Sequence, residues 1–107
     1  MKLIIAIVQD GDSSKLLSVL MQHSFGVTKL ATTGGFLRAG NTTIIIGTED
    51  ELVDKCIEVI GSEAERRTEM VPSTASYDIG RYASFPVEVQ IGGATIFVLD
   101  VEQFKKL

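Results

Sequence analysis

The chain has 107 residues and a formal net charge of -4; apolar residues make up 45% of it and charged residues 22%. This length fits one domain with a single core, and the low count of 2 prolines argues against disorder. The 10 basic residues are scattered along the chain, which excludes the basic surface of a protein that binds long nucleic acids. We therefore predict one globular domain spanning residues 1–107.

The single cysteine and the apolar first residues indicate the cellular compartment of the protein. Cys56 alone closes no intramolecular disulfide and builds no zinc site, so we interpret it as a small buried hydrophobe. The apolar run 3–8 stops at Gln9 and Asp10, which makes it too short for a membrane span, and no signal-peptide cleavage site follows it. We expect a cytoplasmic protein with no membrane partner.

The first half of the chain predicts a strand, a helix and two further strands. Residues 3–8, rich in β-branched side chains, are typical of a central strand. Asp10 and Asp12 are expected to cap a helix that runs until Gly26 allows a turn, with apolar positions at Leu16, Leu17, Leu20 and Met21. Residues 27–33 and 41–47 then form a hairpin-like pair of strands around the glycine-rich connection 34–40.

The second half predicts a helix, a long loop and two more strands. Thr48 and Glu51 have the spacing of a capping box, and Gly61 is expected to end the helix. The apolar face of this helix consists of Leu52, Val53, Cys56, Ile57 and Ile60. Residues 62–86 are polar without periodicity, so we predict a flexible functional loop, because unstructured connections beyond ~12 to 15 residues are uncommon elsewhere.

Alternating residues 87–91 and the run 94–99 flank Gly92 and Gly93, a pattern that predicts two strands joined by a tight primed turn. The complete order is typical of an α+β, ferredoxin-like antiparallel sheet with two helices on one face. The strands are apolar on both faces, whereas the helices cover only one of them. We therefore expect another subunit to cover the second face.

The glycine-rich connection invites comparison with a phosphate-binding loop. Its glycines have the spacing of a nucleoside-triphosphate loop, but Asn41 stands where the phosphate-binding lysine belongs, and a strand follows instead of a helix. A looser anion nest remains open, with hydroxyls from Thr28 and from Thr32 or Thr33, a base-reading amide from Asn41 and a stacking ring from Phe36. In the alternative reading, the glycines only shape a loop and Phe36 fills the core.

No residue pattern in the sequence indicates catalysis. The single histidine, His23, has no nucleophile placed beside it and is read as ordinary surface, and no metal-ligand spacing occurs. The carboxylates of residues 49–51 precede a predicted helix, where the helix dipole explains them. We predict a protein that is not an enzyme and that needs neither a metal nor a cofactor.

Three segments closely resemble the PII-like cyclic di-AMP receptors: residues 1–10, residues 31–43 (ATTGGFLRAGNTT) and the late PVEV with GGAT. The resemblance spans nearly the whole chain. It implies a ferredoxin-like homotrimer with three pockets between neighbouring subunits, each holding one cyclic di-AMP. It also implies roles for six residues: Thr28 meets a phosphate, Gly35, Phe36 and Leu37 line the pocket against adenine, and Asn41 with the Gly47 backbone recognises the base.

The chain departs from this family at Gly26, where several relatives carry an arginine that reaches the phosphate. A weaker affinity is the expected consequence unless Lys29 or Arg38 replaces that contact. The resemblance further implies a signalling role, in which the ligand orders residues 62–86, and residues 34–40 in addition, to change affinity for an unidentified downstream protein. The alternatives are a PII-type sensor of ATP or another mononucleotide, and a structural adaptor trimer without a ligand.

Overall fold

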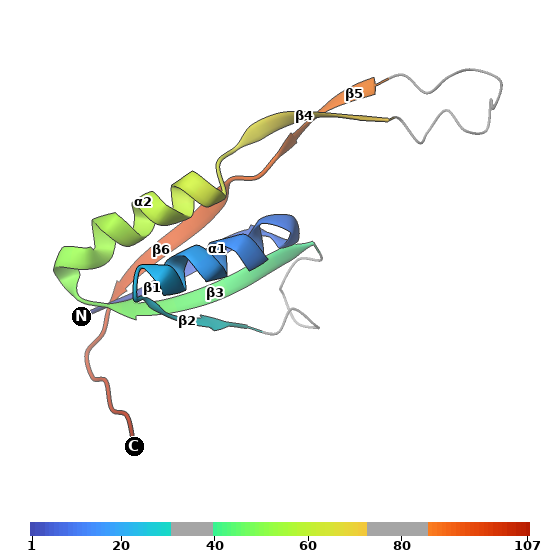
Figure 1. The fold of residues 1–107 in the computed structure, drawn as a ribbon. Coiled ribbons are helices and arrows are strands. Elements are labelled where there is room, and N and C mark those ends of the chain that lie inside the picture. The colour runs from blue at the N-terminus through green and yellow to red at the C-terminus, as the bar shows by residue number, and fades with distance from the viewer. Residues whose placement is uncertain (31–39, 73–85) are drawn as a thin grey trace.

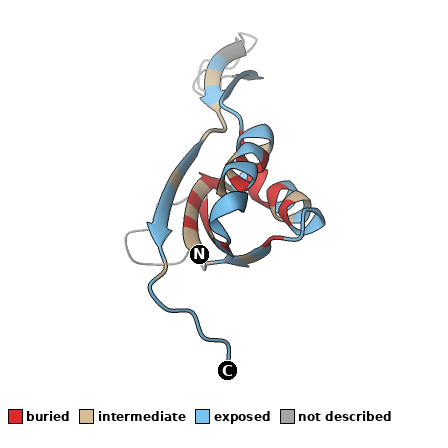
Figure 2. Cartoon of the chain, turned by 90° about the vertical axis from the view of Figure 1, so that its left-hand side faces the viewer, coloured by how far each residue is buried: buried red, intermediate tan, exposed pale blue. Residues whose placement is uncertain are grey.

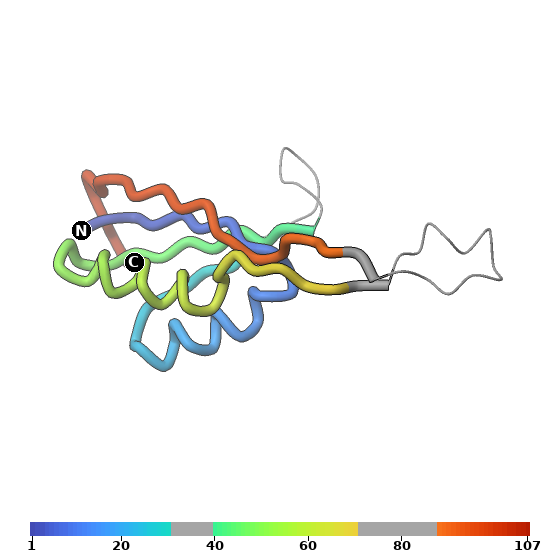
Figure 3. Tube along the Cα trace, turned by 90° about the horizontal axis from the view of Figure 1, so that it is seen from above, coloured from blue at the N-terminus to red at the C-terminus, as the bar shows by residue number. Residues whose placement is uncertain are grey.

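The computed structural model describes residues 1–30, 40–72 and 86–107 of the chain. Its main sheet has four antiparallel strands in the spatial order β2-β3-β1-β6. These strands are β1 (Lys2–Gln9), β2 (Gly26–Lys29), β3 (Asn41–Thr48) and β6 (Ala94–Asp100). Helices α1 (Asp10–Gln22) and α2 (Val53–Glu63) lie side by side on one face of the sheet (Figures 1 and 3), which confirms the predicted α+β, ferredoxin-like class.

The hydrophobic core lies between the helices and the sheet (Figure 2). Successive strand residues point to opposite faces, so alternate residues of β1 enter this core and the others do not. The fully buried side chains include Ile4, Ala6, Leu16, Leu20, Ile44, Ile46, Cys56 and Ile60. Burial raises the pKa of the Cys56 thiol to about 11, so the thiol is neutral at physiological pH, as the interpretation of Cys56 as a buried hydrophobe requires.

The second face of the main sheet carries no described helix. Its side chains include Leu3, Ile5, Ile7, Thr28, Ile45, Phe97 and Leu99, and we call this surface the open face. Ile5 lies opposite Ile45 on one side and opposite Phe97 on the other, so the apolar residues form a continuous patch. Phe97 is 53% exposed and Leu99 is 45% exposed. Apolar surface of this extent typically marks a site of association.

A second sheet contains only β4 (Arg67–Pro72) and β5 (Pro86–Ile91), which pair in antiparallel register. This two-stranded sheet projects past the end of the main sheet (Figures 1 and 3), and we call it the arm. The prediction of irregular structure throughout residues 62–86 was therefore wrong for the end of α2 and for β4. The polar residues of β4 face water on both sides, so they show no alternation that would reveal a strand.

The predicted hairpin of residues 87–91 with 94–99 was also wrong. β5 pairs with β4, whereas β6 pairs with β1. Gly92 and Gly93, with φ values of +81° and +88°, form the junction at which the chain passes from the arm to the main sheet. A primed turn needs the same left-handed glycine conformation, which is why the sequence alone does not distinguish the two structures.

The predicted helix caps do not form. Gln9 and Leu52 hold the N-cap positions of α1 and α2, and neither makes a side-chain cap bond. A short 3-10 helix, Asp50–Leu52, precedes α2, so the capping box of Thr48 and Glu51 is absent. The predicted cap residues Asp10 and Asp12 lie inside α1 and bind distant partners, so tertiary contacts replace the local caps.

Two strand and helix boundaries also differ from the predicted ones. α2 continues through Gly61 to Glu63, where Gly61 was expected to end it. β2 ends at Lys29, four residues short of the predicted end, and the last three of these positions lie outside the described residues. Within the described parts of the chain, no helix is long and apolar enough to cross a membrane.

Candidate functional site

Three of the six predicted ligand-binding residues lie in the part of the chain that the structure describes. Thr28 is in β2, Asn41 begins β3, and Gly47 is near the end of β3. Gly35, Phe36 and Leu37 lie outside the described residues. Asn41 and Gly47 are six steps apart on one strand, which is roughly 20 Å at about 3.4 Å per step. Within one chain, they therefore belong to opposite ends of the sheet.

Thr28 and Gly47 line a common cavity of about 600 Å³ at the end of the sheet where β1 begins, and we call it the Thr28 cavity. The described residues that line it are Met1, Leu3, Gly26, Val27, Thr28, Ile45, Gly47, Val101, Phe104, Lys105 and Lys106. Several of them belong to the open face, so the cavity opens on the surface that the helices leave uncovered. No carboxylate side chain occurs among these lining residues, and two of them, Lys105 and Lys106, have cationic side chains.

At two glycines in the wall of the Thr28 cavity, no side chain fills the space. A Cβ added at Gly26 would meet no atom within 4 Å, and one at Gly47 would come no closer than 3.5 Å, to the side chain of Met1. Lys29 is not among the described lining residues, and its register partner Ile44 is in the core, so Lys29 extends from the opposite face of β2. It is thus poorly placed to replace a cationic contact at Gly26. Arg38 lies outside the described residues.

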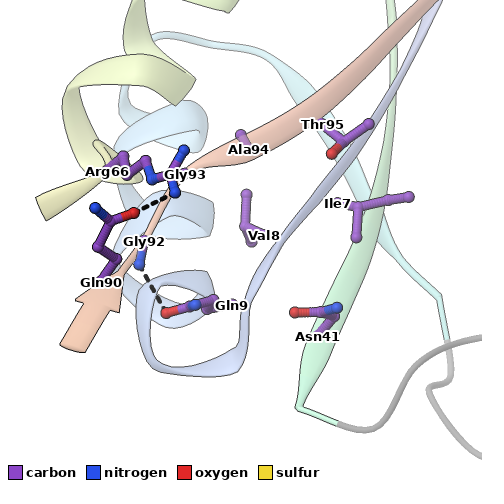
Figure 4. A pocket seen from close by; sticks show the side chains of 10 residues that line it. All are labelled: Ile7, Val8, Gln9, Asn41, Arg66, Gln90, Gly92, Gly93, Ala94 and Thr95. Carbon is purple, nitrogen blue, oxygen red and sulfur yellow. Dashed lines mark hydrogen bonds between the residues drawn. The ribbon is translucent and has the colours of Figure 1, made fainter.

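Asn41 lines a second cavity, of about 560 Å³, at the other end of the sheet, which we call the Asn41 cavity (Figure 4). The described residues that line it are Ile7, Val8, Gln9, Asn41, Arg66, Gln90, Gly92, Gly93, Ala94 and Thr95. They come from β1, β3, β6 and the base of the arm. The side chains combine amides, a guanidinium and apolar groups, which suits recognition of a polar planar ring.

Hydrogen bonds of the residues on either side of Asn41 hold it at the rim of this cavity. Gly40 has a φ of +89°, a conformation that side chains disfavour, and its carbonyl oxygen accepts a hydrogen bond of 2.9 Å from the Asp10 amide. Thr42 donates a hydrogen bond of 2.5 Å from its hydroxyl to the carboxylate of Asp10. Asn41 itself lies directly opposite Gln9 in the β1–β3 register. These contacts fix the start of β3 against the end of β1. The backbone from which the Asn41 side chain extends therefore has a fixed position.

The base of the arm is bonded to the same cavity. The Gly92 amide donates a hydrogen bond of 2.8 Å to the side-chain oxygen of Gln9, and Arg66 donates one to the side-chain oxygen of Gln90 (Figure 4). A Cβ at Gly92 would collide with the carbonyl oxygen of Glu65, so this junction requires glycine. A ligand that binds beside Asn41 and Gln9 would therefore meet groups that also hold the arm in place.

An ion pair braces the arm against α1. Arg67 donates a hydrogen bond of 2.8 Å to Asp12, whose side chain is 8% exposed, and another of 2.9 Å to the carbonyl oxygen of Glu65. The hydrogen bond with Asp12 raises the pKa of the Arg67 guanidinium above its ordinary value. Because a buried carboxylate without its partner is costly, this pair fixes where the arm leaves the body.

The sequence missed several residues that line these cavities. Gln9 and Gln90 carry no motif, and Arg66 resembles an ordinary solvated side chain; only the three-dimensional pairing of β1, α2 and the arm brings them beside Asn41. Lys105 and Lys106 belong to a tail that has no pattern of its own. Within the described residues, no group of three His, Cys, Asp or Glu side chains is placed to hold a metal ion.

The fold and its two cavities are those of a small α+β protein with room for ligands. Comparison with known proteins assigns the chain to a family. The whole chain, residues 1–107, matches the family described as Cyclic-di-AMP receptor, and the chain belongs to that family. A solved structure, described as a functionally unknown protein from Pediococcus pentosaceus ATCC 25745, is similar to it at 42% identity and a TM-score of 0.78. The match covers 99% of this chain and 96% of the other.

The family assignment confirms the resemblance that the sequence indicated. It implies that the chain is a receptor for cyclic di-AMP, a non-enzymatic binding protein, as predicted. The similarity over nearly the full length of both chains supports the ferredoxin-like fold with its added arm.

Proposed function

We propose that the protein is a cytoplasmic signal-transduction receptor that binds cyclic di-AMP at the interfaces of a homotrimer and reports binding through the arm. The full-length family match carries this proposal. The chemistry of both cavities supports it: the Thr28 cavity offers a hydroxyl and cations for phosphate, and the Asn41 cavity offers amides for a base. A single buried free thiol suits a reducing compartment.

The separation of the two cavities supports a site shared by two subunits. A single base is much smaller than the roughly 20 Å between Asn41 and Gly47 of one chain. If both residues recognise the same base, one must come from each of two neighbouring subunits. The open face supplies the surface that such neighbours need, because its apolar side chains lose contact with water when a second copy covers them.

In this proposal, the output is a change in the arm. A ligand seated beside Asn41 reinforces the contact between Gln9 and the Gly92 amide, which lies at the junction of the arm and the main sheet. Only a state-dependent contact of this kind shifts a conformational equilibrium. Residues 34–40 and 62–86 are proposed to become more ordered on binding and to present a surface to a downstream protein.

Isothermal titration with cyclic di-AMP, run beside cyclic di-GMP and ATP, tests this function. We expect saturable binding near one ligand per subunit, selective for cyclic di-AMP. Asn41→Ala should weaken binding by about tenfold or more, because it removes hydrogen bonds to the base. The control is Gln22→Ala, which removes an exposed amide at the end of α1 and should bind as the wild type does. Binding of ATP alone, or no binding at all, would overturn the proposal.

A further inference from the structure

The segment that follows β6, residues 101–107, runs beside the Thr28 cavity and has no role in the fold core. It begins where the Val101 amide donates a hydrogen bond of 3.2 Å to the carbonyl oxygen of Met1, and it then leaves the sheet (Figures 1 and 2). Residues 102–107 are exposed, and Phe104 is 65% exposed. Contact with a ligand would therefore require no unpacking of the core.

Three consecutive residues of this segment, Phe104, Lys105 and Lys106, line the Thr28 cavity. Within the described residues, the ion pairs formed by lysines involve only Lys2, Lys15 and Lys55. Both tail lysines thus have no carboxylate within 4.0 Å in that part of the chain. They also supply the only cationic side chains among the cavity's described lining residues.

We propose that this tail is part of the ligand site, with Lys105 and Lys106 contacting the phosphates of the dinucleotide and Phe104 stacking on a base. This inference rests on the proposed function and names further binding residues for it. A cavity with a hydroxyl, two ammonium groups, an exposed aromatic ring and no described carboxylate is complementary to an anionic aromatic ligand. The tail lysines take the place of a cation that Gly26, in the same cavity, does not provide.

Titration of the double variant Lys105→Ala/Lys106→Ala with cyclic di-AMP tests the inference. We expect binding about tenfold weaker or more, since two charge-assisted contacts are lost. The matched control is Lys15→Ala/Lys55→Ala, which removes two charges from the helices, where they pair with Glu63 and Glu58. The control should bind within about twofold of the wild type, since neither lysine lines the Thr28 cavity.

Two further readouts separate a charge contact from a structural role. Lys105→Arg/Lys106→Arg should retain wild-type affinity, and added salt should weaken the wild type more than the alanine variant. Both alanine variants should unfold at the wild-type temperature without ligand, because all four lysines are exposed. If the wild type binds and the tail variant matches its control, the tail inference is wrong. If the wild type does not bind, the proposed function fails and takes this inference with it.

Discussion

At Gly26 the chain has open space on a cavity wall where a long side chain would fit. The site lies on β2 beside Thr28, and an added Cβ would meet nothing within 4 Å. The φ of Gly26 lies outside the left-handed region that favours glycine, so the backbone accepts any residue there. Gly26 therefore limits the charge of the cavity without being required by the fold.

Gly26→Arg should bind cyclic di-AMP more tightly than the wild type. The added guanidinium would reach phosphate from the wall of the Thr28 cavity, and a hydrogen bond between charged groups contributes about 1.5 to 3 kcal/mol, equivalent to roughly ten- to hundredfold in affinity. The same titration measures it, with Gly26→Gln as a control of similar length but no charge. Equal affinity of Gly26→Arg and Gly26→Gln would show that no phosphate lies within reach of this position.

The sequence predicted the identity of the core residues better than it predicted polar contacts. The spacing of apolar residues identifies Ile4, Leu16 and Ile60 as core residues, because burial repeats with the period of the strand or helix. Asp12 has no such periodicity. Its partner Arg67 is 55 residues away in the sequence, so the local pattern indicated only a helix cap. In the structure, Asp12 instead forms an ion pair with Arg67.

Among the elements, those buried on at least one face were predicted, and so was β5 as a strand, whereas β4 and its pairing with β5 were not. β1, β3 and both helices carry apolar patterns that follow from contact with the core. β4 buries little over residues 67–70, which are all exposed, so its sequence lacks the alternation that identifies a strand. Its pairing also depends on Gly92 and Gly93, whose left-handed backbone serves a turn and a junction equally well.

The arm should become more protected when cyclic di-AMP binds. Its base shares Gln9, Gln90 and Gly92 with the Asn41 cavity, so a ligand there stabilises the contacts that hold the two sheets together. Hydrogen exchange measured by mass spectrometry should show slower exchange in β4 and β5 with ligand present. The buried turns of α2 around Cys56 provide the internal control and should not change. Identical exchange of the arm in both states would refute coupling through its base.

At the scale of the whole molecule, the helices cover one apolar face of the main sheet and leave the other apolar face uncovered. Phe97 and Leu99 project from the open face, and the Thr28 cavity opens on the same side. In the proposed homotrimer, a neighbouring subunit covers this face, buries the apolar patch and contributes its own Asn41 to the site beside Thr28. In that proposal, ligand binding depends on assembly, because each site combines residues of two subunits.

The most direct test of this shared site mixes two defective subunits. Thr28→Val removes the hydroxyl of one cavity and Asn41→Ala the amide of the other, and each variant alone should bind cyclic di-AMP poorly. In randomly mixed trimers, about a quarter of the interfaces would combine a native Thr28 with a native Asn41 from the neighbouring subunit. We predict that titration of the mixture recovers high-affinity binding at about that fraction of sites, because the contacts come from two chains. If the mixture binds no better than its separate components, the two residues act within one subunit or on no common ligand, and the account of a shared site is contradicted.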